Sequence, residues 1–291
     1  MIKKIWTGIL ICVALLTLSF AAFAETEEDF SRYAGTWQEE GENGGRFVIR
    51  ADGGFVHADA DNILDMEGTL ERGSEEIGGT VHRTIRMTDH FGKLDDVFYD
   101  DEEGELTSFQ FGNGDAPAFR KTEAPVPDTA LPEYSYAGDD EKMKLIVEWL
   151  RQEKGQYLMG DVWLPAPVIL MVDDANPEDI RVFGNFWCHW YSLYGTCLVT
   201  ESGGEMPAVF HFAGKDGKIT LKNVETAGDG TDYSRDIKRF CTGYEGLADR
   251  FFKATEEERE ACIASVIREY RDQNGLLIDA YGDLFWPVKP L

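Results

Sequence analysis

Residues 181–217 constrain the fold most, because they predict two long strands joined by a tight turn. Side chains alternate through 183–191 with the period of a strand, and Tyr194-Gly195 offers a two-residue turn. Ser202-Gly203-Gly204 predicts a bulge that bends the second strand. Asp216-Gly217 predicts the next turn, so a long bent antiparallel hairpin organises the second half of the chain.

The predicted turns also set which residues lie opposite one another. A turn at Tyr194-Gly195 places Tyr191 opposite Leu198 and His189 opposite Thr200. A turn at Asp216-Gly217 places Phe212 opposite Leu221 and His211 opposite Lys222. His211 then lies on a polar face, which favours a surface residue over a general base.

The first 24 residues predict a secretory signal peptide. Lys3 and Lys4 precede an apolar run at 9–18, and Ala22-Phe23-Ala24 is a small-x-small site. The run is short for a membrane span. We therefore expect cleavage after Ala24, a secreted or periplasmic protein, and no membrane attachment after cleavage.

The charge of the chain excludes several classes of partner. Its 54 acidic and 28 basic residues give a formal net charge of −26. Such a field repels nucleic acid and anionic lipid. No C-x-x-C pair and no calcium loop occurs, so the sequence predicts neither a metal site nor a cofactor.

Four cysteines follow the signal peptide, and an even number in an oxidising compartment favours disulfides. The predicted hairpin separates Cys188 from Cys197 by about 13 Å, which disfavours that bridge. Cys241 and Cys262 enclose a loop of about 20 residues, whose closure would contribute roughly 3 kcal/mol. Cys241 and Cys262 are therefore the disulfide candidates.

Residues 30–122 predict an all-β domain of eight short strands. Glycine-rich turns separate nearly all of them, which is typical of a meander that closes as a barrel or folds as a sandwich. Phe47, Phe55, Leu64, Ile85, Phe98 and Phe109 are expected to pack against one another. The predicted strands are 36–40, 46–50, 54–58, 66–72, 80–88, 94–99, 106–111 and 118–121.

This domain resembles lipocalin-like domains. The run Tyr33-Ala34-Gly35-Thr36-Trp37 is similar to their G-x-W start, and the Asp52-Gly53-Gly54-Phe55 turn and the Gly68-Thr69-Leu70 strand are similar to short members. The resemblance implies an eight-stranded barrel whose closed end is plugged by Trp37. A chain this short leaves little room for an internal ligand.

A proline-containing linker at 123–137 separates this domain from a second one at 138–291. Apolar residues at helical spacing predict one helix through 143–150 and another from Thr255, where Thr255 and Glu258 form a capping box. Together with the long strands this predicts an α+β domain, a curved antiparallel sheet with packed helices on one side.

The order of these elements loosely resembles nuclear-transport-factor-like and cystatin-like cone folds. The chain is also similar to uncharacterised secreted bacterial proteins in the runs W-x-P-A, F-G-x-F, S-G-G and D-G-x-D-Y. Enzymes among the cone folds carry an acid or histidine and a tyrosine inside the cone. The resemblance implies base, donor and orienter roles for His189, Tyr191 and Asp232 in an isomerase or hydratase acting on a small apolar substrate.

The face with Phe183, Asn185, Trp187, His189 and Tyr191 is the best pocket candidate, with Trp187, His189 and Tyr191 as ligand-binding residues. Because no reactive residues converge by motif, the preferred interpretation is an acidic two-domain binding or interaction protein without catalytic activity. Its partner would be a small apolar ligand or an extracellular protein. The alternatives are the cone-fold enzyme and a structural cell-envelope protein.

Overall fold

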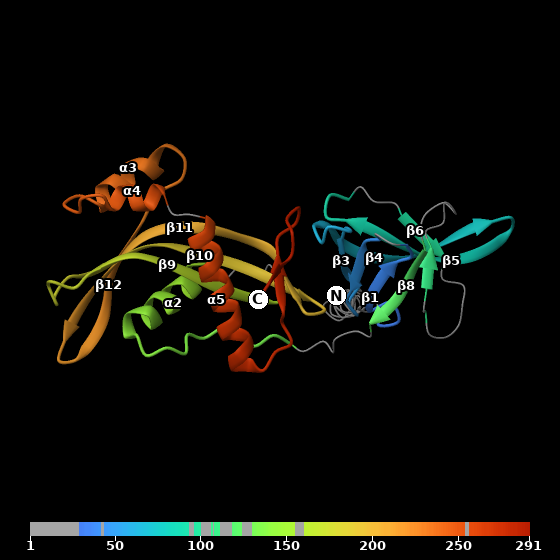
Figure 1. The fold of residues 1–291 in the computed structure, drawn as a ribbon, viewed down its shortest axis with the longest axis horizontal. Helices are drawn as coiled ribbons and strands as arrows, with labels where there is room; N and C mark the ends of the chain where they lie inside the picture. The colour runs from blue at the N-terminus through green and yellow to red at the C-terminus, as the bar shows by residue number, and fades with distance from the viewer. Residues whose placement is uncertain are drawn as a thin grey trace, which may run out of the picture.

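The computed structural model describes residues 29–41, 44–92, 96–99, 106, 108–110, 118–123, 130–154, 160–253 and 256–291. The predicted signal peptide, the linker residues 124–129 and the helix cap at Thr255 lie outside these ranges. The described chain is mainly β, with two sheets lying end to end and four helices around the second sheet (Figure 1). No helix in these ranges is long and apolar enough to cross a membrane.

The N-terminal sheet is antiparallel and curled. Its strands occupy ranges close to the predicted ones and pair in the order β6-β5-β4-β3-β2-β1-β8-β7. The described residues contain no ladder between β6 and β7, so the sheet is an open half-barrel and a closed lipocalin-like barrel stays a prediction. The strands are β1 (Gly35–Glu39), β2 (Arg46–Ile49), β3 (Gly54–Ala58), β4 (Leu64–Ile77), β5 (Thr80–Asp89), β6 (Asp96–Tyr99), β7 (Ser108–Gln110) and β8 (Ala118–Glu123).

Aromatic rings fill the inside of this half-barrel. Trp37 is fully buried, and its indole Nε1 donates a 2.6 Å hydrogen bond to the Tyr33 carbonyl. The ring centroid of Phe109 lies 4.9 Å from that of Trp37 and 4.7 Å from that of Phe98. The expected mutual packing is confirmed except at Leu64, which belongs to the contact between the two sheets.

The C-terminal sheet is built on the predicted hairpin. β11 lies between β10 and two further strands, because β12 pairs with its second half and β13 pairs in parallel with its first residues. The strands are β9 (Val162–Asp173), β10 (Ile180–Tyr194), β11 (Cys197–Lys215), β12 (Lys218–Thr226), β13 (Ala280–Gly282) and β14 (Lys289–Pro290). The helices are α2 (Glu141–Lys154), α3 (Thr231–Phe240), α4 (Leu247–Phe252) and α5 (Glu256–Asn274).

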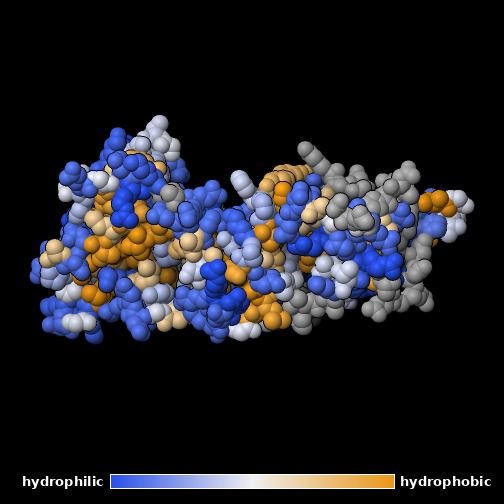
Figure 2. Space-filling view, in the orientation of Figure 1, coloured by the Kyte–Doolittle hydropathy of each residue, from blue (hydrophilic) through white to orange (hydrophobic). Residues whose placement is uncertain are grey.

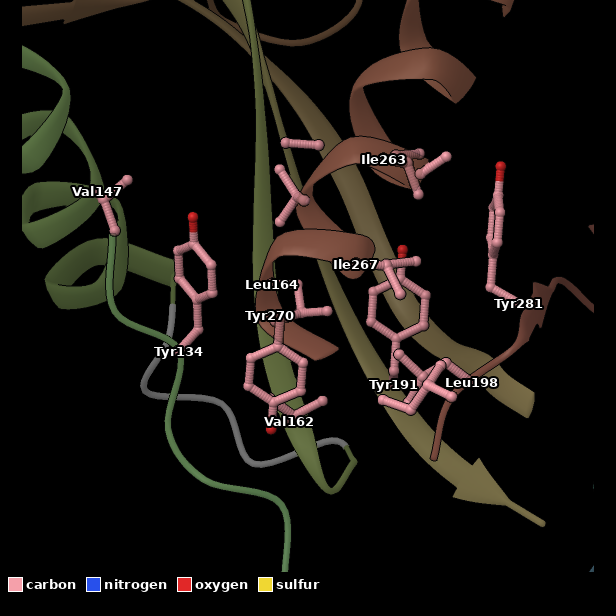
Figure 3. Packing of buried hydrophobic residues seen from close by; sticks show 14 residues of the cluster. Tyr134, Val147, Val162, Leu164, Tyr191, Leu198, Ile263, Ile267, Tyr270 and Tyr281 are labelled. Carbon is pink, nitrogen blue, oxygen red and sulfur yellow. The ribbon is translucent and has the colours of Figure 1, made fainter. Parts of the chain in front are cut away.

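One face of this sheet carries the odd-numbered residues of β10 and is covered by α5, α3 and α4. Ile267 and Tyr270 of α5 share an apolar cluster with Tyr191 (Figure 3). Further along the same face, Ile237 of α3 and Phe251 of α4 pack with strand residues of β9, β10 and β11.

α2 covers the opposite face, so the prediction of helices on one side only is wrong. Ile146 and Leu150 of α2 cluster with Phe186 of β10 and Phe210 of β11, and Trp149 meets the Phe210 ring edge-on at 5.3 Å. β10 is apolar on both faces, and both faces therefore need a cover.

The first hairpin turn lies one residue later than predicted. Tyr194 pairs with Cys197, and the turn residues are Gly195 and Thr196. Gly195 has a φ of 63°, a backbone conformation that Tyr194 would adopt only with strain. The faces are unchanged, because this turn moves each pairing by two residues.

Two bulges shift the pairing further. One bulge lies between Trp190 and Tyr191. Together with the shifted turn, it places His189 opposite Gly203 instead of the predicted Thr200. The predicted turn at Asp216-Gly217 is confirmed by the pairing of Phe212 with Leu221. A second bulge then places His211 opposite Asn223 instead of Lys222.

The two sheets meet in a packed junction. Val56 and Leu64 of the N-terminal sheet share a buried cluster with Tyr194 and Val199 of the hairpin. Next to this cluster, Arg50 donates hydrogen bonds of 2.7 and 3.3 Å to the two carboxylate oxygens of Asp161 and lies over the Tyr194 ring. Asp161 also accepts a 2.9 Å hydrogen bond from the backbone N–H of Leu193.

We expect Asp161→Asn to lower the free energy of unfolding by about 1–2 kcal/mol, because the substitution removes a charged acceptor from a two-pronged contact. Urea denaturation followed by tryptophan fluorescence measures the change. Asp52→Asn is the control, because Asp52 contacts Arg50 from a side chain that is 58% exposed. An equal loss in both variants would contradict a special role for Asp161 at the junction.

Candidate functional site

A pocket of about 240 Å³ lies on the α5-covered face of the C-terminal sheet. His189 and Tyr191 of β10 form its floor. The first turns of α5 form one wall, and side chains from residues 281–289 form the other. The pocket therefore joins three stretches that are far apart in the sequence.

His189 reaches this floor because it alternates with Trp187 and Tyr191 along β10. The imidazole stacks on the Trp187 ring at a centroid distance of 6.0 Å and an angle of 8°, and its centroid lies 5.8 Å from that of Tyr191. A Cβ added at Gly203, the residue opposite, would lie 2.1 Å from Cδ2 of His189. Gly203 thus leaves the space that the imidazole ring occupies.

The Nδ1 atom of His189 is buried and has no hydrogen-bond partner among the described residues. Burial lowers the pKa of His189, a nearby charge on Asp283 opposes this shift, and Arg259 adds to it. A neutral imidazole offers one donor and one acceptor. An unsatisfied buried polar atom costs about 1–3 kcal/mol, which a complementary ligand group would offset.

Tyr191 is 2% exposed, and burial raises the pKa of its phenol well above the ordinary value. The negative charge of Asp283 acts in the same direction. Tyr191 therefore keeps its proton at neutral pH, and its hydroxyl can only be a neutral donor or acceptor.

The α5 wall is an ion-pair network centred on Glu260. Its carboxylate pairs with Arg259 at 2.8 Å and with Lys289 at 2.7 Å, and it accepts a 3.0 Å hydrogen bond from the Tyr281 hydroxyl. Burial acts to raise the pKa of Glu260, but these three donors outweigh burial and hold the pKa below its usual value. The Arg259 guanidinium lies over the Trp187 ring at 5.1 Å.

Asp283 is a site residue that the sequence analysis missed. It lines the pocket with His189 and Tyr191, and its charge influences the titration of both. The only sequence signal is an acidic residue inside the aromatic run 281–286, whose Trp286 is 58% exposed. Nothing in that run indicates which strand it approaches.

The structure does not bring Asp232 to this pocket. Asp232 lies in the first turn of α3, where its carboxylate pairs with Arg235 at 2.9 Å. His211 is also remote from the pocket lining and lies between two carboxylates, with Nδ1 3.2 Å from Asp179 and Nε2 2.9 Å from Glu225. His211 is therefore a member of a half-buried ion-pair cluster.

The predicted Cys241–Cys262 disulfide is not formed. None of the four cysteines after the signal peptide is in a disulfide, and Cys241 and Cys262 belong to different apolar clusters. The Sγ atom of Cys262 lies 3.5 Å from the Pro167 carbonyl oxygen. Burial raises the pKa of Cys197 to about 12 and those of Cys241 and Cys262 to about 11, which makes them poor nucleophiles.

A second hollow, of about 370 Å³, continues from the His189 pocket along the same sheet face. Glu256 and Arg259 line both hollows, and Trp187 and Phe251 line the second. Hydrophobic surface gathers over the strands below α3 and α4 in Figure 2. Asn185, next to Trp187 on this face, is fully buried, and its amide has no partner among the described residues.

A wider hollow of about 1010 Å³ lies beside the junction of the two sheets. Two of its charged residues, Arg50 and Asp161, are paired with one another. It carries no unsatisfied buried polar side chain among the described residues, unlike the His189 face. The unsatisfied buried polar groups therefore favour the His189 pocket over this hollow as the candidate binding site.

The surroundings of His189 differ in one respect from those of a typical catalytic histidine. A catalytic histidine is normally oriented by a hydrogen bond from its second ring nitrogen, and Nδ1 of His189 has no such partner among the described residues. The part of the chain that the structure describes also contains no group of three or more His, Cys, Asp or Glu residues arranged for a metal ion.

Gly203→Ala should push the His189 ring out of its position and lower the free energy of unfolding by about 1–3 kcal/mol, because an added methyl group overpacks the contact. Gly204→Ala is the matched control, since a Cβ there meets nothing within 4 Å. The measurements are thermal unfolding and the NMR signals of the His189 ring. Equal behaviour of the two variants would show that the imidazole does not pack on Gly203.

The unfolding free energy should fall as the pH drops below about 6.5, the pKa of an unfolded-state histidine. The pKa of His189 is lower in the folded state, so the unfolded chain binds the proton first and is stabilised. This contribution stops changing below the folded-state pKa. His189→Gln should remove it, whereas His90→Gln, at a side chain 65% exposed, should not. Denaturant titrations between pH 7 and pH 5 measure the difference.

No protein-family model matches the chain, and neither a curated protein nor a solved structure does. The resemblances to lipocalin-like and nuclear-transport-factor-like folds therefore stay predictions. Function has to be argued from the site.

Proposed function

We propose that the protein is an exported binding protein that holds a small ligand in the His189 pocket without transforming it. The observation that carries this proposal is the imidazole of His189, which lines the pocket while its buried Nδ1 has no partner among the described residues. Buried polar groups normally have a partner. A ligand with a complementary hydrogen-bonding group would supply the partner of Nδ1.

The aromatic surroundings support a binding role. Tyr191, Tyr281 and Trp286 line the pocket together with a few polar groups, which is typical of small-molecule sites, and Trp187 stacks on His189 next to it. The charges in the pocket are mixed, however, and a purely apolar ligand would leave the polar groups of the pocket without a partner. The proposed ligand is therefore small and polar at one end, and it differs in this respect from the small apolar ligand expected from the sequence.

The proposal also includes the location of the protein and the roles of its two domains. The signal peptide at 1–24 would export the chain to the periplasm or the medium. The lipocalin-like domain at 30–122 would act as a support, because aromatic rings fill its described interior. The α+β domain at 138–291 would carry the ligand.

A panel of small organic cations, neutral molecules and anions, titrated into protein labelled with ¹⁵N at histidine, tests the proposal. We expect at least one compound to shift the His189 ring signals in a saturable way. Gly203→Ala should abolish that response and Gly204→Ala should retain it, because only the first displaces the imidazole.

Two results would overturn the proposal. One is a panel in which no compound shifts the His189 signals, or in which binding is the same in Gly203→Ala. The other is conversion of a bound compound, followed by ¹H NMR, that stops in Tyr191→Phe while binding persists. The second result would establish the alternative, an enzyme that uses His189 and Tyr191 as base and donor.

A further inference from the structure

The charged side chains of the His189 pocket leave one carboxylate without a partner. Arg259 and Lys289 are the cations of the pocket, and both pair with Glu260. Arg259 also lies 3.5 Å from Glu256. The Asp283 carboxylate has no hydrogen bond or ion pair among the described residues, so the pocket has an excess of negative charge.

The N-terminal end of α5, which lies at the pocket, does not make the charge of the pocket positive. A helix N-terminus attracts anions, but Glu256, Glu257 and Glu258 already occupy the first turn of α5. The whole chain, with a formal net charge of −26, adds a negative field. An incoming cation is therefore favoured over an anion.

The aromatic rings of the pocket already accommodate positive charge. Nζ of Lys289 lies 5.9 Å from the centre of the Tyr281 ring, and beside the pocket the guanidinium of Arg259 lies over Trp187, which lines the neighbouring hollow. Aromatic faces attract cations through their negative quadrupole. Trp286, half-exposed at the pocket, provides a further ring within reach of a ligand.

We propose that the ligand is a small aliphatic amine in its ammonium form, which pairs with the Asp283 carboxylate and lies against the His189 imidazole. This inference rests on the proposed binding function and names its ligand class. The alkyl part of the amine would contact Ile263 and Leu284, which line the same pocket. A cavity of about 150 Å³ can hold benzene, so a volume of about 240 Å³ restricts the ligand to about ten heavy atoms.

Three probes of nearly equal shape separate charge from size: tert-butylammonium, tert-butanol and trimethylacetate. Each is titrated into the full chain while the His189 ring signals are followed by NMR. We expect tert-butylammonium to bind tightest, and Asp283→Asn to weaken it about tenfold, a loss of about 1.4 kcal/mol. Asp232→Asn makes the same charge change outside the pocket and should leave the affinity unchanged.

A second measurement keeps the inference testable if Asp283→Asn folds poorly. In the unaltered protein, raising the salt concentration should weaken tert-butylammonium binding and leave tert-butanol binding unchanged, because salt screens a charge pair. Salt-independent binding of the ammonium would overturn the role of Asp283.

Failure of the inference is distinguishable from failure of the proposed function. If tert-butanol or trimethylacetate shifts His189 as strongly as the ammonium and loses this effect in Gly203→Ala, the pocket binds ligands but does not select amines. If none of the three probes and no compound of the wider panel shifts His189, both the amine and the binding function are overturned.

Discussion

The ladder between β10 and β11 is the constraint on which the rest of the C-terminal half depends. It runs without interruption in β10 from Ile180 to Tyr194, so successive side chains of β10 point to opposite faces. Because both faces are apolar, α2 must cover one and α5, α3 and α4 the other. The bulge after Trp190 changes the partner of His189 to Gly203, and the missing side chain of Gly203 makes room for the imidazole.

The C-terminal segment connects this ladder to the N-terminal sheet. β13 pairs in parallel with the start of β11, and the following residues bond to β4 through Leu64, which accepts from Phe285 at 2.5 Å and donates to Trp286 at 3.1 Å. Phe285 has a φ of 70°, a strained value for an aromatic residue, held between these bonds. Asp283 is thereby fixed against the pocket, so the N-terminal sheet supports a wall of a site to which it contributes no side chain.

The site combines well-packed aromatic residues with polar groups that have no hydrogen-bond partner among the described residues. Tyr191 is locked under α5, Trp187 is held by His189 and Arg259, and Glu260 gathers three donors. Against this rigid background, Nδ1 of His189 and the carboxylate of Asp283 have no hydrogen-bond or ion-pair partner among the described residues. Preorganised groups of this kind bind at low entropic cost, because little has to be ordered when a ligand arrives.

Features that depend on neighbours along the chain could be predicted from the sequence. Strand alternation placed Trp187, His189 and Tyr191 on one face, and the turn at Asp216-Gly217 follows from residues that tolerate positive φ. The sequence did not predict that Asp283, and not Asp232, lines the pocket with His189, or that Cys241 and Cys262 lie in separate clusters. These placements depend on the parallel pairing of β13 with β11 and on the packing of helices over the sheet. Such contacts join residues that are far apart in the chain. They therefore leave no periodic pattern in the sequence from which they could be predicted.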